Sequence, residues 1–107
     1  MADYILTQKD DGQSLQVPVG ARIKIDLPEN PTTGYRWNVQ ELESESIAVE
    51  SDNYTSGEGV GIGGAGIRHF TFQAKAPGKA TINLKNKRQW EPEEKAMSQF
   101  SVVIFVR

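Results

Sequence analysis

The sequence predicts an all-β domain, and three observations support this class. The dominant apolar period is two residues, as in Arg22–Leu27, where apolar and charged side chains alternate. Turn-forming residues separate such segments at short intervals, as Pro77-Gly78 does. No segment carries a convincing apolar stripe with the 3.6-residue period of a helix. About seven or eight short antiparallel strands in a chain of this length are typical of a β-sandwich.

The expected strands can be placed in chain order. Tyr4–Thr7 and Leu15–Val17 form a first strand that the Asp10-Asp11-Gly12 turn interrupts. The more regular segments follow at residues 21–27, 35–40, 47–54, 67–76, 79–86 and 98–106. The second half of the last segment is apolar on both faces, as in a central strand. This number and spacing of strands predict an immunoglobulin-like β-sandwich.

Strand direction predicts where the connections lie. If each strand runs opposite to the one before it, the connections 28–34, 55–66 and 87–97 all fall at one end of the sandwich. The connections 41–46 and 77–78 fall at the other end and are short or plainly polar. Long loops gathered on one end of a rigid sandwich are typical of a functional surface. The sequence therefore predicts that the functional surface is formed by the loops Glu29–Tyr35, Ser56–Gly66 and Lys87–Pro92.

Length and composition limit the possible functions. A chain of 107 residues predicts one domain, 1–107, and a monomer is the simplest expectation. A net charge of −2 gives no general attraction to nucleic acid or to anionic lipid, so neither partner is expected. The chain has no cysteine, which excludes disulfides, zinc–thiolate sites and thiol catalysis. Loop carboxylates lack metal-ligand spacing, and we expect neither a metal nor a cofactor.

The termini and apolar runs suggest no targeting signal. The first residues contain neither a basic region nor an apolar core of a signal peptide. No apolar run approaches the ~20 residues of a membrane helix. The compartment stays undetermined: the chain is expected to be cytoplasmic, or a mature form whose leader has been removed.

Each of the three loops has an unusual composition. Two prolines stiffen the first loop, and Gly34 can adopt a positive φ just before the next strand begins. The second loop holds six glycines between Ser56 and Gly66, which are costly to order. Trp90 in the third loop is flanked by charged residues and proline, and exposed Trp is a frequent binding hot spot. Trp37, within a strand, is expected in the core.

Structural interpretations of these loops stay open. The first loop can be an ordinary turn, the second an idle flexible connection, and Trp90 a cap over the end of the core. Gly61–Gly66 also fits the G-x-G-x-x-G pattern of dinucleotide sites, but no helix or βαβ unit follows it. An enzyme would have to be built on the only histidine, His69, in a predicted strand, where a structural role is expected.

Together the three loops resemble those of the chagasin family, inhibitors of papain-like cysteine peptidases. The first resembles the family's NPTTGY/F loop, the second its GxGG motif and the third its R-x-W motif. The corresponding residues are Asn30, Pro31, Thr32, Thr33, Gly34 and Tyr35, then Gly61, Ile62, Gly63 and Gly64 with Gly59 and Val60 beside them, and Arg88, Gln89 and Trp90. Two features differ: Gln89 replaces the usual proline, and the glycine motif can also be read at Gly63–Gly66.

The resemblance implies a function for the loop end. It implies a reversible, non-covalent inhibitor, not an enzyme, whose partners are peptidases of the papain or cathepsin type. The Thr32-bearing loop would lie over the catalytic cysteine, and the other two loops would grip either side of the cleft. Trp90 would be the apolar anchor, and the glycine loop would form main-chain hydrogen bonds. The alternative is an adhesion or carbohydrate-binding module of the same fold.

Overall fold

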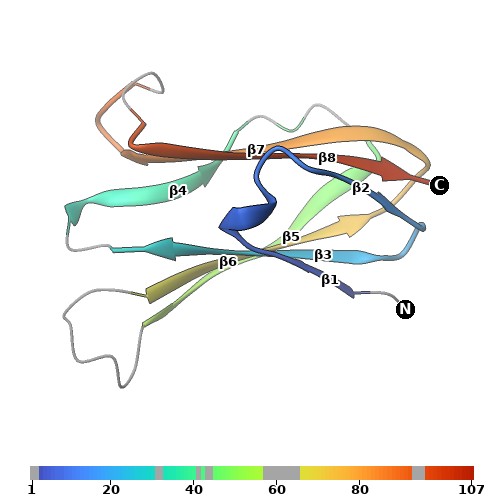
Figure 1. The fold of residues 1–107 in the computed structure, drawn as a ribbon, viewed down its shortest axis with the longest axis horizontal. Coiled ribbons are helices and arrows are strands. Elements are labelled where there is room, and N and C mark those ends of the chain that lie inside the picture. The colour runs from blue at the N-terminus through green and yellow to red at the C-terminus, as the bar shows by residue number, and fades with distance from the viewer. Residues whose placement is uncertain (1–2, 31–32, 41, 43–44, 57–65, 93–95) are drawn as a thin grey trace.

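In the part of the chain that the structure describes, two four-stranded sheets pack face to face (Figure 1). The computed structural model describes residues 3–30, 33–40, 42, 45–56, 66–92 and 96–107. The strands there are β1 (Asp3–Leu6), β2 (Ser14–Val17), β3 (Arg22–Glu29), β4 (Tyr35–Val39), β5 (Ile47–Ser56), β6 (Gly66–Ala74), β7 (Gly78–Arg88) and β8 (Ser98–Val106). The first sheet has the order β1-β3-β6-β5 and the second the order β2-β8-β7-β4. The predicted immunoglobulin-like sandwich is confirmed.

The expectation that all strands pair antiparallel is wrong for two pairs. β1 pairs with β3, and β2 with β8, in parallel. The reason is that strand direction alternates along the chain, whereas neighbouring strands in a sheet are often not consecutive in the sequence. Partners separated by an even number in chain order must then run parallel, whereas β3–β6, β4–β7, β5–β6 and β7–β8 are antiparallel.

The predicted first strand is divided between the two sheets. After β1, the short 3₁₀ helix Gln8–Asp10 and the following turn carry the chain across to the edge of the second sheet. Two side-chain hydrogen bonds help to fix this crossing: the Asp10 carboxylate accepts from the Thr7 amide at 2.8 Å, and the Asp11 carboxylate accepts from the Ser101 amide at 2.8 Å. In the described part of the chain, no helix combines the length and apolar character needed to cross a membrane.

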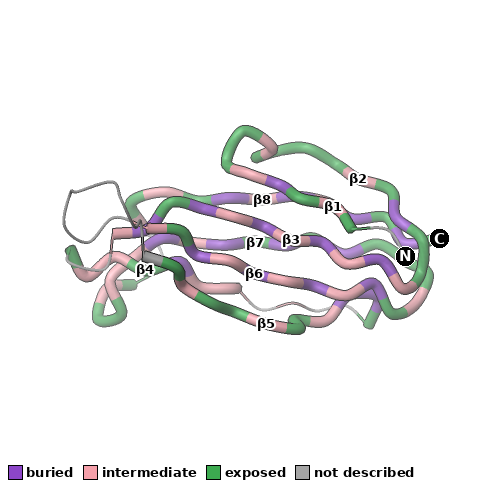
Figure 2. Tube along the Cα trace, turned by 90° about the horizontal axis from the view of Figure 1, so that it is seen from below, coloured by how far each residue is buried: buried purple, intermediate pink, exposed green. Residues whose placement is uncertain are grey.

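The core lies between the sheets, where the inward positions of the central strands are buried (Figure 2). Trp37 on β4 is 2% exposed, which confirms its predicted core position. Its indole Nε1 donates to the Pro28 carbonyl oxygen at 2.8 Å and so links the second sheet to the first. The other large fully buried side chains are Phe70, Phe72, Phe100, Ile23, Ile25, Leu27, Ile82, Leu84, Ile104, Val17 and Val102.

The strands extend further into the three connections than the sequence predicted. Glu29 and Ser56 both pair with Gly66, and Tyr35 pairs with Arg88. β3, β5 and β7 all end at the left of Figure 1, where β4, β6 and β8 begin. The prediction from strand direction is therefore confirmed: the first, second and third connections leave the same end, here called the loop end.

Candidate functional site

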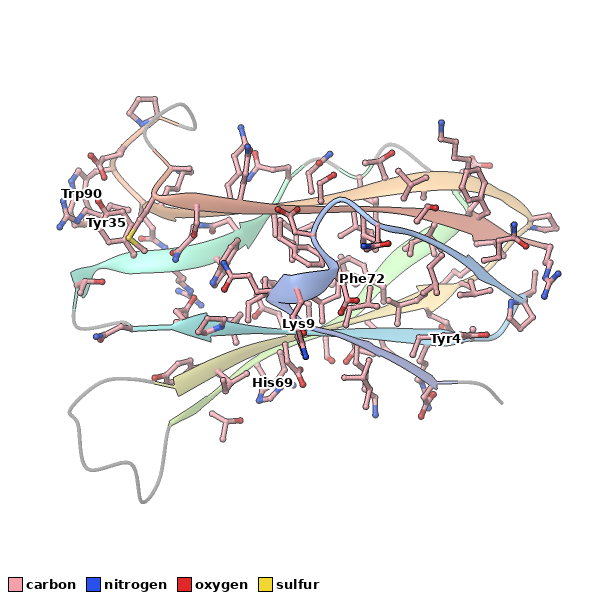
Figure 3. All side chains as sticks on the ribbon, in the orientation of Figure 1. Tyr4, Lys9, Tyr35, His69, Phe72 and Trp90 are labelled. Carbon is pink, nitrogen blue, oxygen red and sulfur yellow. The ribbon has the colours of Figure 1, made fainter. Side chains whose placement is uncertain are left out.

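Two of the three predicted loop motifs come together at the loop end. Asn30, Thr33 and Gly34 lie between β3 and β4, and Tyr35 begins β4. Arg88 ends β7, and Gln89 and Trp90 follow it. Trp90 and Tyr35, which lie at the same end of the sandwich in Figure 3, line one surface hollow. The other predicted residues lie outside the described part of the chain: Pro31, Thr32, Gly59, Val60, Gly61, Ile62, Gly63 and Gly64.

A compact turn orders the described part of the first loop. The carbonyl oxygen of Asn30 accepts hydrogen bonds from the Thr33 amide at 3.2 Å and from the Thr33 hydroxyl at 2.8 Å. That hydroxyl in turn accepts from the Tyr35 amide at 3.4 Å. Gly34 has a φ of 82°, as the sequence predicted, and only glycine adopts this conformation without strain. The turn therefore depends on both Thr33 and Gly34.

Arg88 joins the first loop to the third. Its Nε donates to the carbonyl oxygen of Thr33 at 3.2 Å. Its guanidinium carbon lies 4.5 Å from the centre of the Tyr35 ring and 6.0 Å from that of Trp90, within the range of cation–π attraction. One side chain thus contacts both loops, which explains why an arginine occupies this position.

Trp90 is held in place but stays open to solvent. The residue is 75% exposed, although its ring lies close to Gly34. Beside it, an open hollow of about 490 Å³ lies between the first loop, the third loop and the side chains of Tyr54 and Arg68. The described residues therefore form a surface with an exposed indole at the rim of a concave region.

A buried ion cluster lies directly beneath this surface. Glu29 Oε2 accepts hydrogen bonds from Arg68 Nη2 at 2.7 Å and from Nε at 3.1 Å. Arg68 Nη1 donates to Asp52 Oδ1 at 2.9 Å, and Glu29 Oε1 accepts from the Trp37 amide at 2.7 Å. The Glu29 side chain is 0% exposed and that of Arg68 8%, while that of Asp52 is 45% exposed. We call Glu29, Arg68 and Asp52 the loop-base ion cluster.

Electrostatics keep the Arg68 guanidinium charged. Burial alone would lower the pKa of Arg68, but hydrogen bonds to Glu29 and Asp52, together with their negative charges, outweigh it and raise the pKa above its ordinary value. This cluster was not predicted from the sequence. A signal was present, because Glu29 and Arg68 continue the inward-facing alternation of Ile25-Leu27 and Phe70-Phe72 with charged residues.

His69 lies apart from the loop surface. It faces outward from β6, away from Trp90 in Figure 3, and its Nδ1 lies 2.7 Å from Asp26 Oδ1 on β3. The two residues are directly opposite in the strand register, and both side chains are 35% exposed. This cross-strand pair supports the structural role expected for the histidine.

Comparison with known proteins places the chain in a family. The model of the chagasin family peptidase inhibitors (I42) matches residues 16–104. The chain belongs to this family. It is a chagasin-family inhibitor of cysteine peptidases, and the alternative of an adhesion or carbohydrate-binding module is not favoured.

Individual relatives extend over nearly the whole chain. Chagasin of Trypanosoma cruzi is 31% identical over 103 residues, covering 92% of this chain and 94% of its own. Amoebiasin-2 of Entamoeba histolytica is 30% identical over 111 residues, covering 99% and 87%. The crystal structure of the cysteine protease inhibitor EhICP2 from Entamoeba histolytica superposes with a TM-score of 0.89 at 29% identity, covering 100% of this chain and 97% of that one.

Proposed function

We propose that this chagasin-family protein reversibly inhibits papain-like cysteine peptidases by covering their active-site cleft with the three loops of the loop end. The observation that carries the proposal is that Arg88 ties the first loop to Trp90, so both form one prearranged surface. In this proposal Asn30–Tyr35 covers the catalytic cysteine, and Trp90 and the glycine-rich Gly59–Gly64 grip either side. A single domain, 1–107, acts as a monomer and performs no catalysis of its own.

Prearrangement suits a tight inhibitor. Ordering a loop on binding costs free energy, so a loop already held by hydrogen bonds binds more tightly than a mobile one. Thr33, Gly34 and Arg88 provide such constraints in the unbound chain. Three loops can also bury a standard interface of about 1,600 Å², enough for a stable complex. The hydrogen bond from the Thr33 amide to the Asn30 carbonyl oxygen already holds these two described residues of the first loop together before binding.

The proposed function has a direct test. Papain is titrated with the purified protein while hydrolysis of a small peptide substrate is followed. We expect stoichiometric loss of activity, recovery of activity on dilution, and an inhibitor of unchanged mass afterwards. Trypsin, a serine peptidase, is the control and should retain full activity. The proposal fails if papain hydrolyses its substrate at an unchanged rate in the presence of excess protein.

Residue 32 tests whether the first loop enters the cleft. Replacing Thr32→Trp adds bulk where the proposal places close contact with the peptidase. Overpacking of a filled site costs about 1–3 kcal/mol, so we expect the inhibition constant for papain to rise by about 5-fold to 150-fold. Thr32→Ser keeps the small polar side chain and should inhibit as the wild type does. Full inhibition by Thr32→Trp would show that this loop stays outside the cleft.

Gly34 tests the contact between the first loop and Trp90. A Cβ at Gly34 would lie 3.2 Å from Trp90 Cη2, whereas one at Gly20, which also has a positive φ, would meet nothing within 4 Å. Gly34→Ala and Gly20→Ala should each lower the free energy of unfolding by about 1–2 kcal/mol, from backbone strain. Only Gly34→Ala should also weaken papain inhibition, because it displaces Trp90. Equal inhibition by both variants would contradict this coupling.

A further inference from the structure

Glu29 and Arg68 of the loop-base ion cluster occupy positions where the fold otherwise places apolar side chains. Along β3 the inward residues are Ile23, Ile25, Leu27 and then Glu29, and all four are buried. On β6 the buried series Phe72 and Phe70 ends with Arg68. Burying an ion pair is costly, and apolar residues of similar volume often give equal or greater stability. Stability alone therefore gives a weak reason for charges here.

The contacts of the cluster suggest a different role. Glu29 is the last residue of β3, immediately before the first loop, and it binds the Trp37 amide on β4, just after that loop. Arg68 and Asp52 lie on β6 and β5, the two strands that flank the glycine-rich connection. The cluster therefore joins both sides of the first loop to both sides of the second.

The arginine is suited to making this link. Its planar guanidinium donates through Nε and Nη2 to Glu29 and through Nη1 to Asp52 at the same time. It also lies 5.5 Å from the centre of the Tyr54 ring, on the β5 side of the connection. A lysine is a single point charge and cannot reproduce this fork. Hydrogen bonds depend on direction, so bonds of this kind hold the strands at one relative position. Apolar contacts are not directional and restrict that position less.

We propose that Glu29, Arg68 and Asp52 are positioning residues that hold the strand ends flanking the first loop and the glycine-rich connection in one relative arrangement before a peptidase binds. This inference rests on the proposed function, since it assigns the cluster a part in inhibition. Glu29 and Arg68 are almost fully covered, so they act through the loops and not through contact with the peptidase.

The test removes both charges together. Glu29→Gln/Arg68→Met retains an acceptor for the Trp37 amide and leaves no buried charge unpaired. Arg22→Met/Glu50→Gln is the matched control, because that Arg–Glu pair also joins β3 to β5, with Arg22 Nε 3.1 Å from Glu50 Oε2, but its side chains are exposed. For each folded variant, we would measure the rate constants for association with papain and dissociation from it, and amide hydrogen exchange.

Loss of positioning should slow association, because only the fraction of molecules with correctly placed loops can bind. We expect association about tenfold slower than wild type, unchanged dissociation, and faster exchange in residues 33–37 and 54–68. The control should match the wild type. Wild-type values for both rate constants, or faster dissociation with unchanged association, would overturn the inference.

Two further measurements test the inference if the double variant does not fold or if the wild-type protein does not inhibit papain. If the double variant does not fold, Arg68→Lys retains the charge and removes only the fork. It should show the same slower association, and wild-type rates would overturn the inference. If the wild-type protein fails to inhibit papain, the proposed function fails, and hydrogen exchange still tests the positioning role. Unchanged exchange in residues 33–37 and 54–68 would then overturn it.

Discussion

Replacing Trp90→Ala is expected to weaken inhibition of papain by about 30-fold or more, because truncating a tryptophan hot spot typically costs at least about 2 kcal/mol of binding free energy. Trp90 is 75% exposed, so folding should be little affected. The same exposure leaves the indole available to a partner, while Arg88 and Gly34 hold its position. The measurements are the inhibition constant and the midpoint of thermal unfolding.

An aromatic residue far from the loops provides the control. Phe105 near the end of β8 is 40% exposed and pairs with Lys79, at the opposite end of the sandwich from Trp90. Phe105→Ala should leave the inhibition constant unchanged. If Trp90→Ala also inhibits papain like the wild type, Trp90 is not the anchor, and its position near Gly34 would serve only to cover the turn.

Arg68→Met alone is expected to produce the largest loss of stability, about 3–5 kcal/mol, because it leaves the Glu29 carboxylate buried without its cation. Glu29 would keep its bond to the Trp37 amide but lose both bonds to the guanidinium. Urea unfolding at 25 °C, followed by tryptophan fluorescence, measures the change. The double variant Glu29→Gln/Arg68→Met should recover most of the stability, since no buried charge stays unpaired.

An exposed ion pair again supplies the comparison. Arg22 and Glu50 form two hydrogen bonds, at 3.1 and 3.3 Å, but solvent screens them. Arg22→Met should therefore cost only about 0–1 kcal/mol. Equal losses for Arg22→Met and Arg68→Met would show that the burial of the Glu29–Arg68 pair has no energetic consequence.

Local pattern was sufficient for much of the fold and part of the site. Period-two alternation, as in Arg22–Leu27, predicted the strands, because successive side chains of a strand point to opposite faces. Alternating strand direction predicted that the three loops share one end. The positive φ of Gly34 and the burial of Trp37 also followed from neighbouring residues alone. These properties depend on each segment itself and not on its partners.

Only the tertiary structure decided which segments meet. Alternation shows that Glu29 and Arg68 point inward, but it does not pair two residues that lie 39 positions apart. Nor does it show that the first strand divides between two sheets, or that Arg88 contacts both Thr33 and Trp90. Such contacts depend on the register and packing of distant strands, which no short stretch of sequence encodes. The sequence by itself thus determined an all-β chain with three loops at one end, and the fold determined how the described loop residues are joined.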